Sequence, residues 1–98
     1  MEQNTLNWIR SLRDEEVAQA GAVSISELGF PDIQGTMQIS AQALGHQIKL
    51  LIDQPSHLRF LSKLTDTSRF RDVGAFGTCY LRYLAVQYWL TVHQIFSR

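Results

Sequence analysis

The side chains best suited to catalysis or metal binding in this 98-residue chain are three histidines and one cysteine. His46, His57 and His93 are far apart in the sequence, so no pair has the HxxxH spacing that places two imidazoles on one helix face. Cys79 could act as a nucleophile beside a histidine. However, it falls on an apolar stripe, where a free cysteine behaves as a small hydrophobic residue. The pattern therefore indicates structural or solvated roles for all four.

Other signatures of chemistry are absent from the sequence. Adjacent carboxylates occur only in the run 14–16, which is typical of a solvated helix face. No GxSxG, P-loop or Rossmann pattern is present. One cysteine excludes an internal disulfide and a cysteine zinc cluster. We therefore expect a protein that is not an enzyme and that has no catalytic, cofactor or metal site.

The net charge is zero, but the charges are unevenly distributed. Residues 1–53 contain seven acids and three bases (net −4), and residues 54–98 contain two acids and six bases (net +4). Five of these bases could contact an anion or a nucleic acid: Arg59, Lys63, Arg69, Arg71 and Arg82. A neutral protein lacks the strong attraction to phosphate that dominates such binding. Nucleic-acid binding is therefore the alternative function, and we expect the two halves to complement each other across the fold or across a dimer.

The sequence shows neither a membrane span nor a signal peptide. No segment reaches the 18 or more apolar residues that a span requires, and the first 16 residues are too polar for a signal. We expect a cytoplasmic protein without a membrane partner.

The C-terminal run 74–96 predicts a long helix with more apolar surface than one side can hide. Its wide apolar sector comprises Leu81, Leu84, Ala85, Tyr88, Trp89, Val92, Ile95 and Phe96. A second, narrow stripe, here called the seam, comprises Cys79, Tyr83, Val86 and Leu90. The seam has heptad-like spacing, and a core in so small a chain can cover only one flank of the helix. We expect a second copy to cover the seam; the alternative is cover within the monomer by the first helix or by Leu58, Leu61 and Leu64.

Residues 36–53 can be interpreted in two ways. Residues 36–43 alternate polar and apolar side chains, and Gly45 with His46 suits a type II′ turn, which together predict a β-hairpin. A helix would instead align Met37, Ala41, Leu44, Ile48 and Leu51 on one face. The helix leaves Ile39 and Leu50 outside and places Gly45 in its interior, at a cost of about 1 kcal/mol relative to alanine. We favour the hairpin.

The remaining segments are predicted from residues that cap or end helices. An amphipathic segment begins near Asn4 or Thr5 and ends near Gly21; Ser11 followed by Asp14 could divide it into two short helices. Residues 23–28 match a short strand, although Ser24 and Glu27 also match a helix capping box. Another helix follows Pro55 and Ser56, and Asp72 can cap the last one. Gly74 and Gly77 suggest the close approach of another backbone.

These elements predict one α+β domain over residues 1–98, with an N-terminal helix, a small antiparallel sheet and two further helices, the last of them long. The alternative is an all-α bundle. Because chemistry is missing and a seam is present, the expected function is protein–protein interaction as an adaptor, chaperone or inhibitor. The expected partner is a second copy of the chain, through the seam, or another protein.

Overall fold

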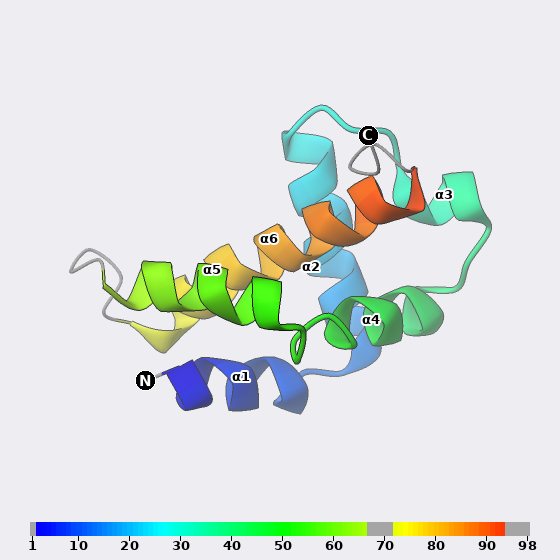
Figure 1. The fold of residues 1–98 in the computed structure, drawn as a ribbon. Helices are drawn as coiled ribbons and strands as arrows, with labels where there is room; N and C mark the ends of the chain where they lie inside the picture. Colours follow the sequence, from blue (N-terminus) through cyan, green and yellow to red (C-terminus); the bar gives the residue numbers. More distant parts are fainter. Residues whose placement is uncertain (1, 67–71, 94–98) are drawn as a thin grey trace.

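The computed structural model describes residues 2–66 and 72–93, and these residues form six helices (Figure 1). The helices are α1 (Glu2–Ser11), α2 (Asp14–Glu27), α3 (Ile33–Met37), α4 (Ala41–Lys49), α5 (Pro55–Thr65) and α6 (Val73–Val92). This part of the chain contains no strand. The predicted α+β fold is therefore wrong, and the all-α bundle is the correct alternative. The radius of gyration is 12.9 Å, as expected for a compact domain of this length.

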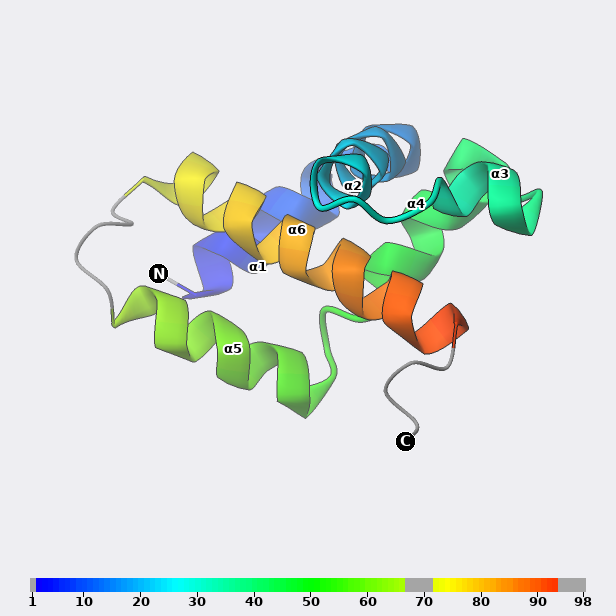
Figure 2. The same ribbon diagram turned by 90° about the horizontal axis from the view of Figure 1, so that it is seen from above.

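Helix α6 is the centre of the bundle. Seen from above, α2 and α5 lie on opposite sides of α6, and α1 passes beneath it (Figure 2). Helix α4 packs mainly against α2. The core includes Phe76, Tyr80 and Leu84 of α6, which recur every four residues and are almost fully buried. Tyr80 belongs to neither apolar sector predicted from the sequence, so the buried face extends beyond the predicted wide sector to include Tyr80.

Residues 36–53 do not form a hairpin. The Ser40 hydroxyl accepts a hydrogen bond from the backbone N–H of Ala43 at 3.1 Å and caps α4. Before it, Gln38 adopts a left-handed conformation (φ 54°) that ends α3. Leu44 and Ile48 are fully buried on the helical stripe, whereas Leu50 is exposed. The alternating pattern therefore spans the end of one helix, a turn and the start of the next.

Gly45 shows why α4 has a glycine in its interior. A Cβ atom at this position would lie 1.7 Å from the carbonyl oxygen of Asp14, at the start of α2. Only glycine lets the two backbones approach so closely. The residue that argued against a helix is therefore required by the packing of α4 on α2.

Residues 23–28 form no strand, because α2 continues to Glu27. Gly21 does not end this helix either. A Cβ atom there would lie 3.0 Å from Cδ1 of Ile48 and 3.2 Å from Cβ of Ala85, so the glycine lets α2 pack closely on α4 and α6. Ile25 is buried and Val23 is exposed, as a helix on the surface of the bundle requires.

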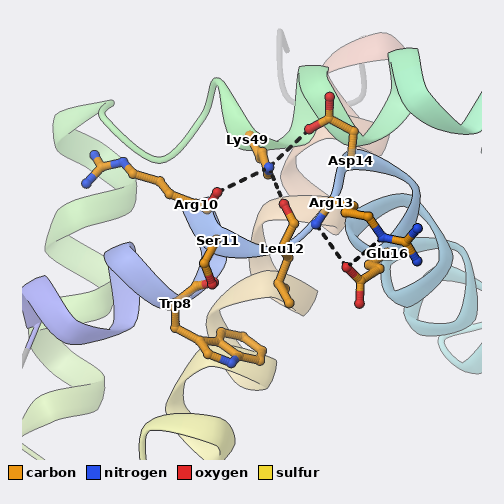
Figure 3. Close-up of polar contacts among 8 residues, drawn as sticks. All are labelled: Trp8, Arg10, Ser11, Leu12, Arg13, Asp14, Glu16 and Lys49. Atoms are coloured by element: carbon orange, nitrogen blue, oxygen red, sulfur yellow. Dashed lines mark hydrogen bonds and ion pairs between the residues drawn. The ribbon is translucent and has the colours of Figure 1, made fainter.

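The first two helices meet at a corner at Leu12 and Arg13, so the alternative of two helices is correct (Figure 3). Ser11 does not cap the second helix, because its hydroxyl donates to the carbonyl of Trp8. Glu16 accepts hydrogen bonds from the backbone N–H of Arg13 at 3.0 Å and from its guanidinium at 3.2 Å. These interactions lower the pKa of Glu16. Lys49 of α4 reaches the same corner, donates to the carbonyls of Leu12 and Arg10, and pairs with Asp14 at 3.1 Å. The ammonium group thus satisfies carbonyls that the end of α1 leaves free.

Two aromatic side chains of α6 fix the loops. The Tyr80 hydroxyl donates to the carbonyl of Ile52 at 3.3 Å, and burial raises the pKa of Tyr80 well above its usual value. The Trp89 indole donates to the carbonyl of Pro31 at 3.1 Å and packs on Phe30. Asp72 accepts from the N–H of Gly74 at the start of α6, which confirms the predicted cap. These contacts fix the orientation of α6 relative to the rest of the bundle.

Candidate functional site

A groove of about 430 Å³ opens between α1, α2 and α6. Its apolar side chains are Trp8 and Leu12 of α1, Ala20 and Val23 of α2, and Leu81 of α6. Its polar side chains are Glu16 and Gln19 of α2, and Thr78 and Arg82 of α6. The apolar lining under a polar rim is typical of a surface that binds another molecule.

Trp8 forms part of the groove because α6 has a glycine opposite it. A Cβ atom on Gly77 would lie 2.3 Å from the indole ring, so the ring packs directly against the helix. The predicted approach of another backbone at Gly74 and Gly77 is therefore wrong, because the group that approaches Gly77 is an aromatic side chain. A Cβ atom on Gly74 would have the Asp72 carboxylate as its nearest neighbour, at 3.4 Å. Any side chain at Gly77 would therefore displace Trp8 and reshape the groove.

The charged residues around the groove are paired. Arg82 forms an ion pair with Glu27 of α2 at 3.2 Å, and Glu16 pairs with Arg13 at the corner. Both pairs are largely exposed, so each contributes little to stability. These four charges cancel, so the groove offers no strong field to attract a highly charged ligand.

Val23 is the exposed apolar residue of the groove. The residue is 51% exposed, compared with 55% for Leu50 of α4 and 60% for Leu28. Leu50 and Leu28 do not line the groove. Val23 thus adds exposed apolar surface next to the half-buried Trp8, where a ligand could cover both.

The seam predicted on α6 is partly covered within the monomer. Tyr83 stacks on Phe60 of α5 with 3.8 Å between ring centroids, and His57 contacts it edge-on at 5.4 Å. Leu61 of α5 is fully buried. Cys79, Val86 and Leu90 are half-buried. The sequence alternative was that leucines of the helix after Pro55 cover the seam. This helix does cover Tyr83, but the ring contacts come from Phe60 and His57.

A second hollow continues from the groove along α6. It is lined by Asp72, Gly74, Ala75, Thr78, Cys79 and Arg82. Thr78 and Arg82 belong to both hollows, which connects the groove with the start of the seam at Cys79.

The basic residues predicted to contact nucleic acid do not converge in the described part of the chain. Arg59 and Lys63 are exposed on α5, whereas Arg82 pairs with Glu27 on the α2 side of α6 (Figure 2). Arg69 and Arg71 lie outside the described residues. Arg59 and Lys63 therefore share no surface with Arg82.

The histidines and Cys79 form no catalytic or metal-binding group among the described residues. No cluster of three potential metal ligands occurs there. His46 lies on the exposed side of α4, not in a hairpin turn, and His57 is buried in α5. His93 packs against Trp89 with tilted rings at the end of α6, about 21 Å along the helix from Cys79. Their separation leaves the groove as the candidate site.

Most of the groove could not be found from the sequence. No signal in the sequence places Trp8 beside the last helix, and Val23 falls in the segment that was matched to a strand. The signal that was available is Gly77, which indicated a close approach without identifying the partner as Trp8.

No helix in the described residues is both long and apolar enough to span a membrane. No protein-family model, curated protein or solved structure matches the chain.

Proposed function

We propose that this protein is a non-enzymatic protein-binding module that holds an amphipathic helix of another protein in the groove between α1, α2 and α6. The observation that carries this proposal is the half-exposed Val23 side chain beside Trp8 and Leu81 in an open apolar groove. Covering Val23 and the exposed part of Trp8 would remove apolar surface from water and so favour association, whereas Leu81, only 3% exposed, forms the floor of the groove. Tryptophan is also among the residues most often found as binding hot spots.

A helix suits the groove because two of its walls are helices. The α2 wall has Gln19 and Val23 four residues apart, and the α6 wall has Thr78 and Arg82 at the same spacing. The grooves beside ridges with this spacing can receive the ridges of another helix. An amphipathic helix places its apolar residues three or four positions apart and can therefore contact both walls.

The paired charges favour a protein ligand over a polyanion. Arg82 is neutralised by Glu27, and Glu16 lies on the opposite wall. A phosphate backbone would gain little from such a rim and would meet an acidic side chain. A partner helix whose flank is uncharged or of mixed charge does not depend on a positive rim and is not repelled by Glu16.

Two substitutions of similar exposed apolar residues test this proposal. Helical peptides would be selected from a display library against the native protein, and their affinities measured by fluorescence anisotropy. We expect Val23→Glu to weaken binding at least about tenfold, because it places a charge against the apolar ligand. The matched control Leu50→Glu, on α4 outside the groove, should change the affinity less than about twofold. Equal loss in both variants, or a library that yields no binder, would contradict the proposal.

A homodimer through the seam is the second candidate, favoured by the half-buried Cys79, Val86 and Leu90 on α6. A second copy would cover the same residues on both chains by twofold symmetry. Light scattering should then give twice the monomer mass for the native protein. It should give the monomer mass for Val86→Asp, because the charge would be buried in the interface. A monomeric native protein would eliminate this candidate.

A further inference from the structure

Helix α5 covers part of α6 through a small aromatic cluster. Phe60 stacks on Tyr83 in nearly parallel planes, 6° apart, while the His57 ring meets Tyr83 at 69°. His57 is one turn before Leu61, which is fully buried. The docking of α5 therefore depends on the side chain of His57 remaining compatible with an apolar interface.

His57 is held in surroundings that suit only its neutral form. The residue is 6% exposed, and its Nδ1 atom has no hydrogen-bond partner among the described residues. It is also the third residue of α5, after Pro55 and Ser56. An imidazolium there would face the positive end of the helix dipole. Its added N–H would be buried without an acceptor.

We propose that α5 is a pH-sensitive cover of α6, which protonation of His57 releases so that Tyr83 becomes accessible. Released, α5 would leave Tyr83 exposed alongside Cys79, Val86 and Leu90, and the complete seam would face solvent. This device goes beyond helix binding in the groove and does not depend on it. The segment that covers the seam is α5 itself, because Phe60 of α5 stacks on Tyr83.

The neighbouring ionisable groups do not offset protonation. From α6, the group that faces His57 is Tyr83. Burial raises the pKa of Tyr83 above its usual value, so its hydroxyl is neutral at and below neutral pH. From α1, which also contacts α5, Arg10 carries a positive charge and is paired with Asp53 at 2.6 Å. A positive charge on His57 would therefore gain no free carboxylate from these groups.

The direction of the pH effect follows from the neutral native state. Burial lowers the pKa of His57 below its usual value of 6.5. Released α5 therefore binds a proton that docked α5 does not, and release becomes more favourable as the pH falls below about 6.5. Above that pH the docking of α5 has its full stability, because His57 is neutral in both docked and released α5.

Hydrogen exchange followed by mass spectrometry at pH 7.5 and 5.5 tests the proposal on the full chain. After correction for the intrinsic exchange rate, we expect protection of α5 amides to fall between about three- and tenfold at pH 5.5. Protection of α2 and α4 should change by less than twofold. Constant protection in α5, or an equal loss in every helix, would overturn the proposal.

Histidine variants identify the group responsible. His46→Gln, on the exposed side of α4, and His93→Gln, at the end of α6, should keep the response of the native protein. His57→Phe keeps an apolar ring against Tyr83 and should abolish the response. A response that persists in His57→Phe, or disappears in His93→Gln, would assign the effect to another group. If His57→Phe does not fold, the native protein and the two glutamine variants still decide the question.

Discussion

Replacing Gly45 by alanine is expected to destabilise the protein by about 3 kcal/mol, although alanine is the better helix former by about 1 kcal/mol. The added Cβ atom would lie 1.7 Å from the carbonyl oxygen of Asp14. Backbone cannot rotate away as a side chain can. Relief therefore requires α4 to move from α2, which loosens the packing around Leu44 and Ile48. Urea unfolding monitored by circular dichroism measures the change.

Gly74→Ala is the matched control, because it makes the same substitution in a helix without a backbone neighbour. The nearest atom to a new Cβ there is a carboxylate oxygen of Asp72 at 3.4 Å, which is ordinary contact. We expect its free energy of unfolding to stay within about 0.5 kcal/mol of the native value. Similar values for the two variants would mean that α4 and α2 do not approach as described.

Lys49→Met is expected to lower the free energy of unfolding by about 2 kcal/mol. Methionine keeps most of the apolar stem but removes the ammonium group that binds the carbonyls of Leu12 and Arg10 and pairs with Asp14 (Figure 3). The Lys49 and Asp14 side chains are only 20% and 25% exposed, so water cannot fully replace these interactions. The same urea titration provides the measurement.

Arg13→Met provides the comparison for Lys49. The ion pair of Arg13 with Glu16 is at the same corner, but its side chains are 77% and 46% exposed. Its loss should cost no more than about 0.5 kcal/mol. An equally small loss for Lys49→Met would show that the corner does not depend on the ammonium group.

The sequence predicts the helices at both ends of the chain better than the middle. The cap at Asp72 is a local signal that places the start of α6 correctly, whereas Ser11 marks the break between α1 and α2 without capping α2, because its hydroxyl donates to the carbonyl of Trp8. Residues 36–43 carry a strand-like alternation because the end of α3, the Gln38 turn and the Ser40 cap follow one another closely. The decisive contact, Gly45 against Asp14, joins residues 31 positions apart and leaves no local trace.

The candidate site was less predictable than the fold. Its lining comes from α1, α2 and α6, and only the packing of these three helices places Trp8 and Val23 beside Leu81. The seam was identified correctly as apolar, but Phe60 and His57 were not predicted to cover Tyr83. The lining of the groove and the cover of Tyr83 were missed for the same reason. Helical periodicity identifies an apolar face without specifying which element packs on it.

The two tryptophan indoles allow the most direct measurement of helix binding in the groove. Trp8 lines the groove, whereas Trp89 is bound to the carbonyl of Pro31 in the loop before α3. In a ¹H–¹⁵N spectrum recorded while a selected helical peptide is added, the indole signal of Trp8 should move to saturation and that of Trp89 should stay in place. A bound peptide that moves Trp89 and leaves Trp8 unchanged would contradict the proposed function.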